Sequence, residues 1–140
     1  IVEVFGVAPP FGLGATPASY PAGFAEDELV PPTDNPSAFE GAPLTPNQFV
    51  RTINTRALEL AGCLPGDTAL FDMSVTPREG DVVAANVYLQ GSAETVLRLL
   101  EPPYVVTRTM DGEIGNKPRL VDNQHVKIMA VLVKLTRARD

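Results

Sequence analysis

The chain has 140 residues, 44% of them hydrophobic, which suits one domain with its own apolar core. A formal net charge of -6 predicts that this part of the protein does not bind DNA, because nucleic-acid affinity comes largely from clustered Lys and Arg. One cysteine excludes an intramolecular disulfide and fits a cytoplasmic location. No apolar run approaches the roughly 18 residues of a membrane-spanning helix, so we expect no membrane contact.

Residues 1–45 form a predicted N-terminal arm that is rich in Pro and Gly. Residues 1–8 are β-branched and partly alternating, which predicts a short strand that ends at Pro9-Pro10. Beyond it, the Pro and Gly density excludes long regular elements, so we expect a loose linker. The chain begins at Ile1 within an apolar stretch, and we expect it to be a fragment of a longer protein.

Residues 46–140 are predicted to form a compact β body. Residues 55–61 contain good helix formers, with Thr55 as a possible cap and Gly62 as a stop, so we expect one short helix of about two turns. Short β-branched or apolar runs separated by Pro and Gly turns predict strands at 47–54, 68–72, 82–89, 94–100, 104–110 and 126–135. The expected fold class is therefore mostly β.

Three landmarks follow one another between residues 53 and 100. A Pro65-Gly66-Asp67 turn leads into a strand, Gly80-Asp81 leads into Val82-Val83-Ala84, and Thr95-Val96-Leu97-Arg98 follows. This order resembles the C-terminal domain of the self-cleaving repressors, LexA and phage CI, which are serine-lysine peptidases. The resemblance implies a LexA/signal-peptidase-like β-barrel or sandwich. Residues 121–135 fit the family's C-terminal pattern more loosely.

The two catalytic residues of that family are missing from this chain. Ala57 stands where the resemblance places the nucleophilic serine, and Leu97 where it places the lysine base. Such a dyad needs a neutral buried lysine to remove the serine proton, and neither a methyl nor an isobutyl group can do this. We expect no catalytic residues and interpret the pair as a natural loss, because leucine fills the lysine's space with apolar volume. The alternative is a self-cleaving peptidase captured as an inactive mutant.

The sequence contains few other candidate functional residues. Ala22-Gly23 is the type of dipeptide that the family cleaves, which makes it a vestigial cleavage-site candidate. A hydrolase that uses Cys63, with the single histidine His125, is a third and weaker reading, because a lone apolar-flanked cysteine is usually a buried hydrophobe. The acidic run 26–28 is interpreted as a solvated charge run. We expect no cofactor and no metal, since no phosphate loop, zinc spacing or dinucleotide fingerprint is present.

The resemblance implies a dimerisation and regulatory domain of a phage- or prophage-type transcriptional repressor. Its helix-turn-helix domain is then expected before Ile1, and DNA is bound only through that missing domain. Without self-cleavage, a protein antirepressor is the expected off-switch. We predict a homodimer formed by the apolar final strand, with Val131 and Val133 central among the candidates Ile128, Ala130, Val131, Leu132, Val133 and Leu135.

Overall fold

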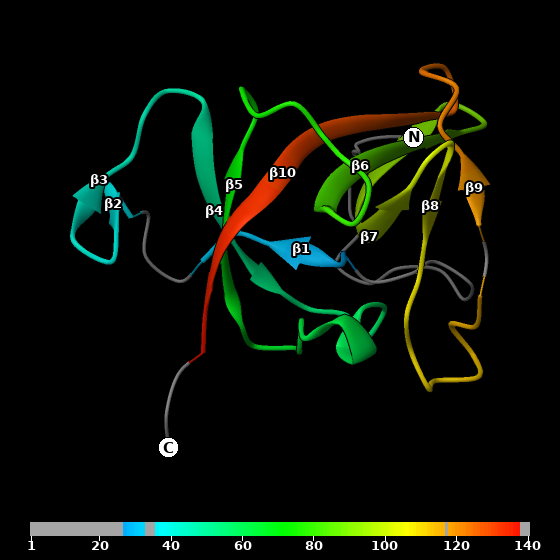
Figure 1. Ribbon diagram of the computed structural model, residues 1–140, viewed down its shortest axis with the longest axis horizontal. Helices are drawn as coiled ribbons and strands as arrows, with labels where there is room; N and C mark the ends of the chain where they lie inside the picture. Colours follow the sequence, from blue (N-terminus) through cyan, green and yellow to red (C-terminus); the bar gives the residue numbers. More distant parts are fainter. Residues whose placement is uncertain (1–26, 33–35, 117, 138–140) are drawn as a thin grey trace.

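A computed structural model describes residues 27–32, 36–116 and 118–137, and it shows a mostly β protein (Figure 1). One antiparallel sheet has the order β1-β4-β5-β10-β6-β7-β8-β9, and a separate hairpin joins β2 to β3. The predicted strand at 1–8 and the dipeptide Ala22-Gly23 lie outside the described residues. The strands are β1 (Leu29–Val30), β2 (Ala38–Phe39), β3 (Ala42–Pro43), β4 (Gln48–Ile53), β5 (Thr68–Asp72), β6 (Val82–Leu89), β7 (Ser92–Glu101), β8 (Tyr104–Val106), β9 (Arg119–Leu120) and β10 (Val126–Thr136).

The predicted mostly β class is confirmed, and β5 and β6 have the bounds that the sequence pattern predicts. The predicted strand at 104–110 is too long, because β8 ends at Val106. The buried Thr107 hydroxyl donates to the Gly115 carbonyl at 2.5 Å, and the Arg108 N–H donates to the Ala57 carbonyl at 2.7 Å. These bonds direct the chain away from the sheet at the end of β8.

The predicted helix at 55–61 is wrong in extent, because only a 3-10 turn, η2 (Glu59–Ala61), forms there. The Thr55 hydroxyl accepts the N–H of Ala57 at 3.1 Å, a local bond that competes with helical hydrogen bonding. Leu58 then has φ -124° and ψ 31°, outside the helical region. The predicted stop is confirmed, since Gly62 has φ 95°, a left-handed conformation that favours glycine.

The long strand β10 exchanges one neighbour for another at Val131 (Figure 1). Its first half pairs with β6 and its second half with β5, and the register shifts once in each half, next to Met129 and next to Val133. Ala130 and Val131 are therefore only 2% and 3% exposed. The side chain of Val131, which we predicted to be central to a dimer contact, packs in the core of its own chain, and this argues against a place in the contact. The dimer itself stays a prediction.

The sheet curves so that each face covers its own group of buried side chains. On β7, Leu97 belongs to one group, while its neighbour Val96 and Leu100 belong to the other. This alternation follows from the two-residue period of a strand. The first group lies inside the curve of the sheet and contains the residues Leu29, Ile53, Leu58, Cys63, Ala69, Phe71, Ala84, Leu97 and Ala130.

The first strand almost closes this curve. β1 pairs with β4 through two residues and also contacts β7, although no strand ladder joins β1 to β7 (Figure 1). Pro31 and Pro32 follow β1 directly and have no N–H to donate, which limits its length. Because Leu29 is only 8% exposed, the described residues 27–32 are packed on the body, unlike the loose linker that the composition predicts. In the part of the chain that the structure describes, no helix is long and apolar enough to cross a membrane.

Candidate functional site

Ala57 lies at the start of the turn that leads into η2, and it is fully buried. Its N–H is bonded to the Thr55 hydroxyl and its carbonyl accepts the N–H of Arg108. The turn is braced further by Glu59, whose carboxylate accepts the Thr109 hydroxyl and the N–H of Met110. These bonds hold the pKa of Glu59 below its ordinary value, with Thr109 the largest cause. The backbone at Ala57 is thus held by several hydrogen bonds, and its side chain is a methyl group.

Leu97 on β7 is also fully buried. It belongs to the same core group as Leu58, the residue that follows Ala57, and as Leu29 of β1. Leu58 and Leu97 thus share one core group, and Ala57 precedes Leu58 in the chain. An amine at position 97 would lie among apolar side chains, whereas leucine adds apolar volume to them. This arrangement favours packing.

Glu28 contributes a feature that the sequence pattern did not reveal. Its carboxylate accepts the Leu97 N–H at 3.1 Å and binds the Arg98 guanidinium at 2.7 Å and 3.3 Å. Both side chains are largely buried, with 16% of Glu28 and 13% of Arg98 exposed. The interpretation of 26–28 as a solvated charge run is therefore wrong for Glu28. On this edge of β7, β8 pairs only with residues 99–101. The Leu97 N–H therefore has no strand partner among the described residues, and the Glu28 carboxylate accepts its hydrogen bond instead.

Asn54 donates two hydrogen bonds to backbone carbonyls of the same segment. The Asn54 N–H donates to the Glu28 carbonyl at 2.8 Å, and its side-chain amide donates to the Asp27 carbonyl at 3.0 Å. Residues 27–28 are therefore bonded both to Asn54, which follows β4, and to Leu97 of β7. No local sequence signal could have shown this, because 69 residues separate Glu28 from Leu97.

Asp67, the last residue of the Pro65-Gly66-Asp67 turn, binds the end of β10 through Arg137. It is 1% exposed, its carboxylate accepts the Leu64 N–H at 2.9 Å, and it binds the Arg137 guanidinium at 2.7 Å and 2.8 Å. These bonds, that of Arg137 first, lower the pKa of Asp67 below its ordinary value. Arg137 also donates to the Gly62 carbonyl at 3.0 Å, so the end of β10 is joined to the turn after η2.

Cys63 has the properties of a core residue. It is 2% exposed, and burial, with the nearby Asp67 charge, raises the pKa of its thiol. His125 is 71% exposed at its side chain, and its Nδ1 lies 2.8 Å from the Asp122 carboxylate. Among the described residues no hydrogen bond joins Cys63 to His125. A buried thiol with a raised pKa forms little thiolate, so these features argue against Cys63 as a nucleophile.

No group of three or more His, Cys, Asp or Glu side chains in the described ranges could hold a metal ion. Comparison with protein-family models and with curated protein sequences yields no match.

The Glu28 contact predicts a measurable change in the edge of β7. Glu28→Gln removes the charge that Arg98 and the Leu97 N–H share, so we expect the free energy of unfolding to fall by about 1–2 kcal/mol. Hydrogen exchange at the Leu97 amide should also become faster, because β1 is held less tightly.

The matched control is Glu79→Gln, which removes a carboxylate from an exposed turn. It should leave both the free energy of unfolding and the Leu97 exchange rate as in the natural chain. Equal exchange rates in the Glu28→Gln variant and the natural chain would show that the carboxylate does not hold β1 in place.

Proposed function

We propose that this chain is the dimerisation and regulatory domain of a cytoplasmic transcriptional repressor of the phage or prophage type. It is related to the self-cleaving repressors and has lost their peptidase activity. The DNA-binding helix-turn-helix belongs to sequence before Ile1, and this acidic domain does not contact DNA itself. A protein antirepressor inactivates this repressor, whereas self-cleavage inactivates the repressors of the family that it resembles.

One observation carries the proposal: Ala57 and Leu97 are both fully buried within a mostly β scaffold. A single inactivating substitution would leave the other partner of the dyad in place. Here both polar groups are replaced, and Leu97 packs with Leu29, which belongs to the arm. This mutual packing supports a scaffold adapted to the absence of the lysine amine, and it favours natural loss over an engineered block.

The second half of β10 supports the dimer part of the proposal. Val133 is 40% exposed next to a register shift, whereas Leu132 and Leu135 are partly buried. In this half, β5 pairs with one edge of β10, and no described strand pairs with the other edge. An isologous contact between two copies would cover Val133 and satisfy that edge.

The dimer is tested with Val133→Asp. A carboxylate at the centre of an apolar two-fold contact meets its own copy, so we expect the mass in solution to fall from dimer to monomer. Light scattering across a concentration series measures this. Leu89→Asp is the matched control, because Leu89 is 45% exposed at the far end of β6, and this variant should remain dimeric.

A natural chain that is monomeric would contradict the dimer. A folded Val133→Asp variant that stays dimeric would show that Val133 lies outside the interface. The repressor assignment itself is tested by the coding sequence upstream of Ile1. A helix-turn-helix there, with operator binding by the longer chain, supports the proposal, and a different upstream domain overturns it.

A further inference from the structure

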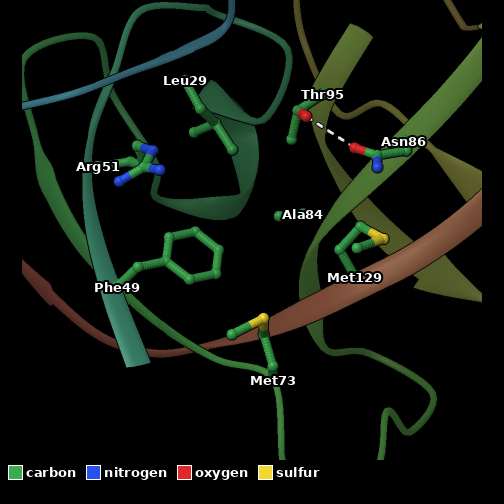
Figure 2. A pocket seen from close by; sticks show the side chains of 8 residues that line it. All are labelled: Leu29, Phe49, Arg51, Met73, Ala84, Asn86, Thr95 and Met129. Carbon is green, nitrogen blue, oxygen red and sulfur yellow. Dashed lines mark hydrogen bonds between the residues drawn. The ribbon is translucent and has the colours of Figure 1, made fainter. Parts of the chain in front are cut away.

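Eight residues surround a hollow of about 230 Å³ (Figure 2). Its walls come from β1, β4, β6, β7 and β10 and from the residue after β5, so nearly every strand around the inner core contributes. Concave, mostly apolar hollows with a few polar groups are where small molecules usually bind. Neither Ala57 nor Leu97 lines this one.

The hollow is apolar inside and carries one positive charge. Leu29, Phe49 and Ala84 line the apolar part. The guanidinium of Arg51 lies 4.9 Å from the centroid of the Phe49 ring, and its Nη1 donates to the Val50 carbonyl at 2.8 Å. Among the described residues no carboxylate forms an ion pair with Arg51. A guanidinium held against a ring retains further N–H donors in its plane, and these suit a carboxylate.

Two methionines form the adaptable part of the wall. Met129 lies at the register shift of β10, and Met73 follows β5; Figure 2 shows both beside the hollow. β-Bulges commonly re-aim a side chain next to a site, and methionine adjusts its shape to an apolar ligand. On the other wall the Thr95 hydroxyl donates to the Asn86 amide oxygen at 2.7 Å, so these polar groups already satisfy each other.

We propose that this hollow binds a small monocarboxylate with an unbranched or lightly branched hydrocarbon body. The hydrocarbon lies against Phe49, Met73 and Met129, and the carboxylate binds the guanidinium of Arg51. Binding there would place a small-molecule site on the domain, away from Ala57 and Leu97. The inference rests on the hollow and on Arg51, and it stands whether or not the chain is a repressor.

The test uses octanoate as the probe and octanol as its uncharged match, added to the whole chain with ¹³C-labelled methionine methyl groups. The chain has three methionines, and Met110, which is 80% exposed on a loop outside the hollow, serves as an internal reference. We expect octanoate to shift the Met73 and Met129 signals and to leave Met110 unchanged. Arg51→Gln should weaken octanoate binding about fivefold or more, with octanol binding little changed.

Arg51→Lys keeps the charge but lacks the planar fork, so its affinity for octanoate should lie between those of the natural chain and Arg51→Gln. Absence of shifts at Met73 and Met129, equal shifts at all three methionines, or equal affinity for octanoate and octanol would each overturn the proposal. The octanol comparison in the natural chain decides the role of charge even if an Arg51 variant fails to fold.

Discussion

The Leu97→Lys variant is expected to lose about 4–5 kcal/mol of unfolding free energy at pH 7. The side chain at this position is fully buried in the apolar core. Full burial lowers a lysine pKa by about 3–5 units, so the buried amine is largely neutral at pH 7, and keeping it neutral there costs about 1.4 kcal/mol for each of the roughly 3 units below its unfolded pKa. Denaturant unfolding followed by circular dichroism measures the loss.

The pH dependence has a definite sign. The folded-state pKa of the new lysine lies below its unfolded value of about 10.4, so the unfolded state binds more protons between the two values. The loss should therefore be largest below the folded-state pKa, on the acidic side of neutrality, and shrink as the pH rises through neutral towards about 10. Leu97→Met, a neutral change of similar volume, should cost less than about 1.5 kcal/mol at every pH.

The same variant distinguishes natural loss of the dyad from the alternative of an inactivated self-cleaving peptidase. A loss below about 1 kcal/mol at pH 7 would mean that the site still accommodates an amine, which favours the inactive-peptidase reading. Cleavage near Ala22-Gly23 at alkaline pH by the double variant Ala57→Ser with Leu97→Lys would strengthen that reading further. A destabilised double variant that stays intact supports natural loss.

Asp67→Asn is expected to lower the free energy of unfolding by about 2–3 kcal/mol near neutral pH. The substitution keeps the size of the side chain but removes the charge that binds Arg137 through two nitrogens. The turn after η2 then loses its link to the end of β10. Thermal unfolding at pH 7 measures the effect, and Asp27→Asn, at an exposed position, should change it by less than about 0.5 kcal/mol.

Acid should reduce this difference. The pKa of Asp67 is lowered in the folded chain, so its stabilisation is complete above the unfolded value of about 3.9 and is lost as the pH falls through the folded value. The natural chain and Asp67→Asn should therefore become similar in stability at low pH. A constant difference down to pH 2 would show that the bond to Arg137 does not depend on the charge of Asp67.

Strand positions could be predicted because they depend on neighbouring residues. β5 and β6 are bounded by turns whose Pro and Gly set the local backbone, and their bounds match the pattern. The helix prediction failed over 55–61, where the helix-forming pattern is equally local. A single hydroxyl, that of Thr55, and the Arg108 N–H from a distant loop decided the backbone there instead.

At the candidate site, too, burial of apolar residues could be predicted from the sequence, whereas long-range contacts could not. The sequence identified Ala57 and Leu97 as apolar residues, and both are buried. It could not identify Glu28 as the partner of Arg98, or Arg137 as the partner of Asp67, because each contact joins residues about 70 positions apart. Charge patterns along a chain carry no information on such pairings until the fold is known.

The mostly β class and the positions of the longer strands could be read from the sequence, as could the lack of a reactive group at positions 57 and 97. These properties depend on residue type and short-range spacing. The fold was needed to show that the side chain of Val131 packs in the core, that Glu28 binds the edge of β7 at Leu97, and that Arg51 lines a hollow. Each of these depends on which strands become neighbours, and β10 has two different neighbours along its length. The burial of any one side chain is therefore fixed by the whole curved sheet, and not by the run of residues around it.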